Sequence, residues 1–255
     1  MNPKSAAPLS DQSTPHSIET KAEDWLNGSN RPGRRRFLQL AGCGALSAGL
    51  ANAGLIASSP KAFAQANLST PDGVLQELLD GNKRFTTGKI TSNDHDLEIL
   101  KQHNAEKQEP FAAVLSCADS RVPVELVFDQ TIGHIFVARV AGNMVTPEII
   151  ATLEYGTAVL GTKVILVMGH AACGAVKATI QAKAVPGQIS VLYQHIQPAV
   201  DEAGTDLEAA IKANAKIQAG LLSKSSTVIA EMVKAGKVKV AAAYYDIVTG
   251  NLTIL

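Results

Sequence analysis

The chain has 255 residues, which is enough for one or two domains. Its 23 basic and 23 acidic side chains cancel, and from residue 65 onward 16 basic residues stand against 19 acidic ones, so the main part of the chain is mildly acidic and we expect no nucleic-acid partner. A hydrophobic content of 46% permits a sizeable core. The three cysteines, Cys43, Cys117 and Cys173, include no Cys-x-x-Cys pair, which excludes a disulfide framework.

Residues 1–64 have the layout of a bacterial export signal. Residues 1–33 are polar and lack a hydrophobic period, so we expect disorder there. The pair Arg34 and Arg35 then precedes Phe-Leu and an apolar run, and small residues end at Ala64. The twin arginine resembles a Tat signal, which implies the Tat export machinery as a partner and a periplasmic or secreted protein after cleavage near Ala64. A transmembrane anchor and a surface basic cluster are the alternatives, although glycines interrupt the apolar run.

Five apolar runs predict the strands of one sheet. Four of them suit buried parallel strands, and they cover residues 111–115, 134–140, 163–168 and 238–247. The fifth, at residues 252–254, follows a Thr-Gly-Asn turn, so we expect it to run antiparallel to the fourth.

Helical patterns separate these strands. They cover residues 147–160, 174–182, 190–200 and 206–234, and the last has a break near residues 223–226. Two further helices precede the first strand: one has Thr70 as its cap and ends at Gly81 and Asn82, and the other covers residues 95–104. Residues 65–255 are therefore predicted to form one α/β domain, with a mostly parallel four-stranded sheet flanked by helices and a short fifth antiparallel edge strand.

Two chemically reactive stretches follow predicted strands. Cys117 lies two residues after the end of the first strand, and His170 lies two residues after the end of the third. Ligands of parallel sheets bind outside the carboxyl ends of the strands. The topology therefore predicts that both stretches line one site.

The residue types in these stretches suit a zinc ion. His170 and Cys173 are three residues apart and can reach one ion, with Cys117 as a third ligand. Asp119 can fill the fourth position or yield it to water, and a bidentate pair with Arg121 would hold its carboxylate away from the metal. Buried structural cysteines and a disulfide between Cys117 and Cys173 are the alternatives.

Glycines beside the second stretch favour a close approach of the main chain to a ligand. Gly169 and Gly174 fit a tight turn there. We therefore include Gly174 among the candidate substrate contacts.

The two stretches closely resemble the signatures of the β-class carbonic anhydrases. The first reads Cys117-Ala118-Asp119-Ser120-Arg121, and the second reads His170-x-x-Cys173-Gly174. The resemblance runs from about Thr70 to the C-terminus. It implies zinc on Cys117, His170 and Cys173, with Asp119 as an exchangeable fourth ligand and the Asp119–Arg121 pair as a gate.

The same resemblance implies the substrate pocket and the assembly. The matching pocket positions are Gln108, Phe136 and Tyr155. In the family this pocket forms across a dimer interface, so the resemblance implies a homodimer or a higher homo-oligomer.

The expected activity is the reversible hydration of carbon dioxide to bicarbonate and a proton by hydroxide generated at zinc. A second hypothesis keeps the site but changes the substrate to carbonyl sulfide or carbon disulfide. A third is a non-enzymatic zinc-binding periplasmic protein with a permanently closed site. The presence of Asp119 with Arg121, a pair that is useful only if the site opens, argues against the third hypothesis.

Overall fold

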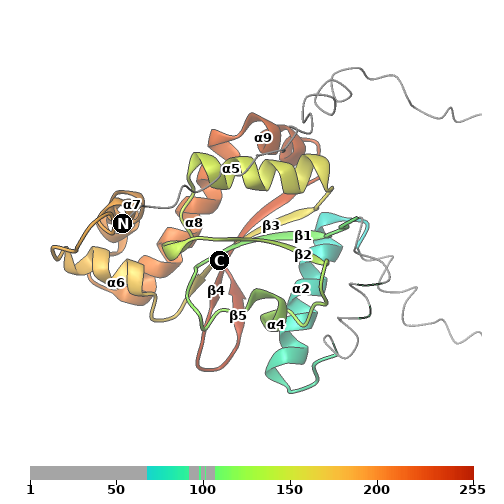
Figure 1. Cartoon of the computed structure of the whole chain (residues 1–255), viewed down its shortest axis with the longest axis horizontal. Coiled ribbons are helices and arrows are strands. Elements are labelled where there is room, and N and C mark those ends of the chain that lie inside the picture. Colours follow the sequence, from blue (N-terminus) through green and yellow to red (C-terminus); the bar gives the residue numbers. More distant parts are fainter. Residues whose placement is uncertain (1–67, 92–97, 99–100, 102–106) are drawn as a thin grey trace, which may run out of the picture. The chain divides into compact units, whose positions relative to one another are not determined.

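A five-stranded sheet organises the part of the chain that this computed structural model describes, residues 68–91, 98, 101 and 107–255 (Figure 1). Its strands are β1 (Ala112–Ser116), β2 (Ile135–Arg139), β3 (Val164–His170), β4 (Lys239–Tyr245) and β5 (Leu252–Ile254). Their order in the sheet is β2-β1-β3-β4-β5. The first four strands are parallel, and β5 is antiparallel to β4. The predicted fold class is therefore confirmed. The predicted export signal lies outside the described residues, as does most of the predicted helix at residues 95–104.

One helix precedes the sheet, and the others lie in the connections between the parallel strands. The helices are α2 (Pro71–Thr86), α4 (Val124–Val127), α5 (Pro147–Glu154), α6 (Gly174–Gln181), α7 (Val191–Ala203), α8 (Leu207–Ser225) and α9 (Thr227–Lys234). A short 3₁₀ helix, η2 (Ala141–Asn143), precedes α5, and a short π-helix, η3 (Tyr155–Val159), follows it. Among the helices described here, none is both long enough and apolar enough to span a membrane.

Side-chain caps explain where several helices begin. Thr70 Oγ1 accepts a hydrogen bond from Gly73 N, and Thr146 Oγ1 accepts one from Ile149 N, each followed by a proline in the first turn. These residues satisfy amide groups that have no partner inside the helix. Ser226 caps α9 in the same way, which confirms the predicted break in the long C-terminal helical segment.

The strands bury alternate side chains on the two faces of the sheet. On one face, which we call the α2 face, Val114 and Leu166 pack with residues of α2 and α4. On the other, the α8 face, Leu115 and Val167 pack with residues of α5, α8 and α9. Figure 1 shows α5, α8 and α9 above the sheet and α2 and α4 below it. Because both faces are covered, β1 and β3 are buried along their whole length.

The predicted end of the first helix is wrong. Helix α2 continues past Gly81 and Asn82 to Thr86. Gly81 instead allows a close approach, because a Cβ atom there would lie 1.8 Å from the carbonyl oxygen of Phe128. A glycine that resembles a stop signal thus permits tight packing between α2 and the chain after α4.

Strand β3 is longer than predicted and ends at His170 rather than at residue 168. Its last two residues pair with the end of β4, as Gly169 with Tyr244 and His170 with Tyr245. Gly169 accordingly lies in the sheet, where a Cβ would come within 3.0 Å of Ile211 Cγ2 in α8. It therefore serves packing against α8, and the prediction that it shapes the ligand turn is corrected.

Candidate metal centre

The two reactive stretches meet at the carboxyl ends of neighbouring strands. Cys117 directly follows β1, His170 is the last residue of β3, and Cys173 caps α6. The turn between the last two needs a left-handed residue, Ala172, with φ of 55°. One potential ligand atom from each of Cys117, His170 and Cys173 lies within 4.8 Å of the others. The structure thus brings the three predicted zinc ligands together.

His170 presents a free acceptor to this cluster. Its Nδ1 lies 2.9 Å from the carbonyl oxygen of Ala171, which can only accept, so Nδ1 carries the proton. The deprotonated Nε2 is then buried without a protein hydrogen-bond partner, and the side chain is fully buried. A buried acceptor without a partner is costly unless something else satisfies it. A metal ion between the two sulfur atoms would do so.

The two cysteines are buried, free thiols with opposite acidities. The pKa of Cys117 is lowered, chiefly by a hydrogen bond from Cys173, with smaller help from the Gly142 amide and against the effect of burial. The pKa of Cys173 is raised by the same hydrogen bond and by burial. Both thiols are free, which leaves the disulfide alternative without support.

The donor set fits zinc. Ligand atoms about 2.0–2.3 Å from a tetrahedral zinc ion are separated by about 3.3–3.8 Å, which is within the 4.8 Å limit that the three atoms of this cluster satisfy. Two thiolates and one imidazole suit zinc, and three protein ligands leave one position open, as in catalytic sites. The chemistry of the donors and the unpaired Nε2 of His170 therefore agree on the same ion.

Asp119 lies beside the cluster but is held by Arg121. Its Oδ1 accepts from Arg121 N and Nε, each at 2.9 Å, and its Oδ2 accepts from Arg121 Nη2 at 2.8 Å. These hydrogen bonds keep the pKa of the Asp119 carboxyl well below its usual range. Oδ2 lies 3.9 Å from His170 Nε2. The predicted Asp119–Arg121 pair is present in this structure, whereas the predicted coordination by Asp119 stays a prediction.

Arg139, at the end of β2, fixes the main chain of the first stretch. Its Nε donates to the carbonyl oxygen of Cys117 at 3.0 Å, and its Nη2 donates to that of Asp119 at 2.6 Å. This role of Arg139 was not predicted from the sequence. The position of Arg139 in the sequence could have indicated this role. An arginine at the end of a strand beside β1 can reach the loop that follows β1.

Two of the predicted pocket residues, Phe136 and Tyr155, lie apart from the metal ligands within this chain, whereas Gly174 directly follows the ligand Cys173. The rings of Phe136 and Tyr155 are near each other, with centroids 6.3 Å apart. Phe136 is paired with Ala113, and Cys117 lies four residues further on, about 13 Å at 3.3 Å per residue. Gln108 is exposed, and so is Gly174, whose Cβ position is open space. The chain therefore pairs two of the four predicted substrate residues and brings neither of them to the ligands.

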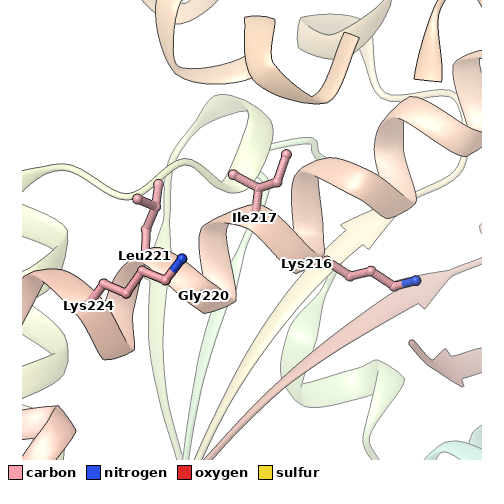
Figure 2. A pocket seen from close by; sticks show the side chains of 5 residues that line it. All are labelled: Lys216, Ile217, Gly220, Leu221 and Lys224. Carbon is pink, nitrogen blue, oxygen red and sulfur yellow. The ribbon is translucent and has the colours of Figure 1, made fainter. Parts of the chain in front are cut away.

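A shallow pocket of about 270 Å³ lies elsewhere, on the outer side of α8 (Figure 2). Lys216, Ile217, Gly220, Leu221 and Lys224 line it. They lie on the helix face opposite the buried side chains that pack on the sheet. The pocket contains no thiol, imidazole or carboxylate, so we assign it no part in the chemistry.

The fold and the ligand cluster define an α/β zinc-binding protein, and comparisons with known proteins identify its family. A family model described as carbonic anhydrase matches residues 112–252. A carbonic anhydrase of Mycolicibacterium smegmatis is 30% identical over 194 residues, covering 73% of this chain and 94% of that protein.

Solved structures agree on the fold. The β-carbonic anhydrase of Coccomyxa in complex with acetazolamide has a TM-score of 0.56 at 25% identity, covering 71% of this chain and 86% of that one. A structure from the study of tetrameric β-carbonic anhydrases of Sordaria macrospora has a TM-score of 0.57 at 22% identity, covering 71% and 96%. The chain belongs to the carbonic anhydrase family, and to its β class.

Proposed function

We propose that the protein catalyses the reversible hydration of carbon dioxide to bicarbonate and a proton. The observation that carries this proposal is the buried Cys117–His170–Cys173 cluster with an ionised carboxylate, that of Asp119, 3.9 Å from His170 Nε2. The family match and the carbonic anhydrase from M. smegmatis support the same reaction.

Each residue of the site has a distinct task. Cys117, His170 and Cys173 would hold zinc, which supplies a hydroxide nucleophile near neutral pH because it lowers the pKa of water toward about 7. Asp119 Oδ2 accepts a hydrogen bond from the attacking water and so orients its lone pair toward carbon dioxide. Arg121 keeps that carboxylate ionised and in place.

The same pair carries the predicted gate. Asp119 can become a fourth ligand only if it leaves Arg121, because both of its carboxylate oxygens accept hydrogen bonds from that residue. Exposed pairs of this kind contribute little stability, since water competes for both partners. Arg121 has an exposed side-chain fraction of 51%, so the exchange is accessible.

We infer that a second subunit completes the substrate pocket. Phe136 lies about 13 Å along the strand direction from Cys117, too far to contact a carbon dioxide molecule held at the metal ligands of its own chain. Tyr155 is 46% exposed although it is aromatic, which suits a surface that contacts another copy. A homodimer or a larger homo-oligomer would place both rings beside the ligands of a partner.

Replacement of Cys173 by serine tests the metal site and the activity together. A hydroxyl is a poor zinc ligand, so the Cys173→Ser protein should lose zinc and carbon dioxide hydration in parallel, measured by metal analysis and stopped-flow assay. The matched control is Gln181→Ser, which introduces the same hydroxyl at the exposed last residue of α6 and should leave both values unchanged. A Cys173→Ser protein with native activity would refute the assignment of Cys173 as a zinc ligand. A parallel assay of the native protein with carbonyl sulfide distinguishes carbon dioxide from the alternative substrate class.

We also propose that residues 1–64 direct export by the Tat route, with cleavage near Ala64 and a periplasmic or secreted product. The support is the twin arginine followed by Phe-Leu, an apolar run and small residues. Replacing Arg34 and Arg35 by lysine keeps the charge but should trap the uncleaved chain inside the cell, as fractionation and mass spectrometry would show. Lysine in place of Arg31 is the control and should not alter export. Unchanged export of the double variant would contradict the Tat route.

A further inference from the structure

We propose that Asn214 and Gln218 of α8 are positioning residues for the metal centre, because they hold the η2 turn whose Gly142 amide donates to Cys117 Sγ. This inference rests on the proposed zinc site and adds to it two residues that touch neither the ligands nor the substrate. Both side chains are buried, with exposed fractions of 1% for Asn214 and 0% for Gln218.

The contact to the ligand is made by the main chain. Gly142 N lies 3.3 Å from Cys117 Sγ, within the range of a hydrogen bond to sulfur. A hydrogen bond to a thiolate withdraws electron density from sulfur, so the position of the amide influences how strongly the sulfur donates to a metal.

The η2 turn is short and strained. Gly142 has φ of 75° and Asn143 has φ of 44°, both in the left-handed region. Asn143 is not a glycine, so its conformation is unfavourable and must be maintained by the surroundings. Within the turn, Asn143 N donates to Val140 O at 2.9 Å. Additional anchors are therefore needed to fix the direction of the Gly142 amide.

Helix α8 supplies those anchors on both sides of the turn. Asn214 Nδ2 donates to the carbonyl oxygen of Gly142 at 2.9 Å. Gln218 Oε1 accepts from Val145 N at 2.7 Å. The two side chains are joined, because Gln218 Nε2 donates to Asn214 Oδ1 at 3.2 Å. The connection thus runs from α8 to the Gly142 carbonyl and, across the Gly142 Cα, from the Gly142 amide to the Cys117 sulfur.

Packing alone does not account for these two residues. They occupy the face of α8 that otherwise buries alanine, isoleucine and leucine against the sheet. A buried amide contributes little net stability even when it is fully hydrogen-bonded, and it is costly when it is not. Gln218 Nε2 also donates to the carbonyl oxygen of His195 in α7 at 3.0 Å, so this amide pair connects α7 and α8 to the ligand turn.

The test compares two variants with a matched control in the full chain. Asn214→Asp replaces the donor to Gly142 O by an oxygen, and Gln218→Met removes all contacts of its amide at similar volume. Asn82→Ala is the control, because Asn82 is a buried asparagine that also donates to main-chain carbonyls, those of Val127 and Gly250, away from the ligand turn. Chemical denaturation of all three provides the comparison of stability.

Two measurements report on the sulfur. In cobalt-substituted protein, the thiolate-to-cobalt charge-transfer band should move to lower energy in Asn214→Asp and Gln218→Met, because the sulfur loses its hydrogen bond. Zinc affinity, measured by competition with a chromophoric chelator, should be about 10- to 100-fold weaker in both variants, and zinc transfer to the chelator should be correspondingly faster. Asn82→Ala should lose stability with the band and the transfer rate unchanged.

The outcomes separate this inference from the zinc assignment. A native protein without any thiolate-to-cobalt band refutes the zinc site itself. A native band that stays unchanged in both α8 variants, or that shifts equally in Asn82→Ala, overturns the positioning role and leaves the zinc site intact. If one α8 variant does not fold, the other decides by the same criteria.

Discussion

Two arginines from different elements hold Asp119 at both ends. Arg121 binds the carboxylate oxygens, and Arg139 binds the main-chain carbonyl of the same residue. Because Arg139 also holds the carbonyl of Cys117, it fixes a ligand and the carboxylate relative to each other. A planar guanidinium can bridge two acceptors in this way, whereas an ammonium group is a single point charge.

We predict that Arg139→Leu lowers kcat/KM for carbon dioxide hydration by about tenfold, equivalent to roughly 1.4 kcal/mol of transition-state stabilisation. The reason is that the Asp119 main chain gains freedom, so its carboxylate orients the attacking water less well. Zinc content should stay at the native level, since no ligand is removed. Stopped-flow kinetics together with metal analysis measure both quantities.

The conservative variant provides the control. Arg139→Lys can reach one carbonyl but not both, so its activity should fall between that of the leucine variant and that of the native protein. Equal activity of all three proteins would show that Arg139 does not position the loop.

The three metal ligands could be predicted from the sequence because the ends of the strands that they follow could be predicted. An apolar run marks β1 and β3, and parallel strands bring their carboxyl ends to one edge, which places Cys117 beside His170. The hydrogen bonds of Asn214 and Gln218 could not be predicted, since they depend on how α8 packs over the loops. Periodicity locates a buried helix face, but it does not identify the main-chain groups beneath that face.

At the scale of elements, local signals predicted helix starts better than helix ends. Thr70 and Thr146 act through neighbouring amides, so their cap role is readable in sequence. Gly81 does not end α2. A glycine is needed there because Phe128, 47 positions away in the chain, leaves no space for a Cβ atom. The rule that a glycine ends a helix therefore fails where contact with a distant segment determines the choice of residue.

Glycine replacements in two helices should have opposite effects on stability. In Gly81→Ala the new Cβ would lie 1.8 Å from the Phe128 carbonyl oxygen, so α2 must shift, and we expect a loss of about 1–3 kcal/mol in the free energy of unfolding. Gly220→Ala in α8 meets no atom within 4 Å, and it should add about 0.4–1 kcal/mol because the unfolded chain loses freedom. Urea denaturation of the zinc-loaded proteins measures both. Destabilisation of equal size in the two variants would contradict the packing argument.

At the scale of the whole molecule, the metal ligands and the aromatic rings of the proposed substrate pocket lie far apart within one chain. Helix α5 follows η2 at the carboxyl end of β2, and η3 follows α5 and leads into the amino end of β3. Tyr155, the first residue of η3, is therefore carried away from Cys117. Phe136 contacts Tyr155 and lies four residues short of the level of Cys117. The family resemblance implied a pocket shared between subunits, but the motif residues by themselves do not predict this separation, because each motif is short and the distance arises from the direction of α5.

Mixing two inactive proteins should therefore restore activity. Cys173→Ser lacks a ligand but keeps Tyr155, whereas Tyr155→Ala keeps the ligands but lacks the aromatic ring. If the pocket is shared in a two-fold dimer, each mixed dimer contains one site with native ligands and a native tyrosine. Random exchange of subunits at equal amounts should then give about a quarter of the activity of the same quantity of native protein.

The recovery depends on which chain supplies the ring, so its absence is equally informative. If Tyr155 served the ligands of its own chain, every mixed dimer would hold one site without a complete ligand set and one site without the ring, and activity would not rise above the mean of the two variants. Subunits are exchanged by mild denaturation and refolding with zinc, and light scattering establishes the oligomeric state before and after. A mixture of Cys173→Ser with Cys117→Ser is the control, because both proteins lack a ligand and no pairing of subunits can restore one.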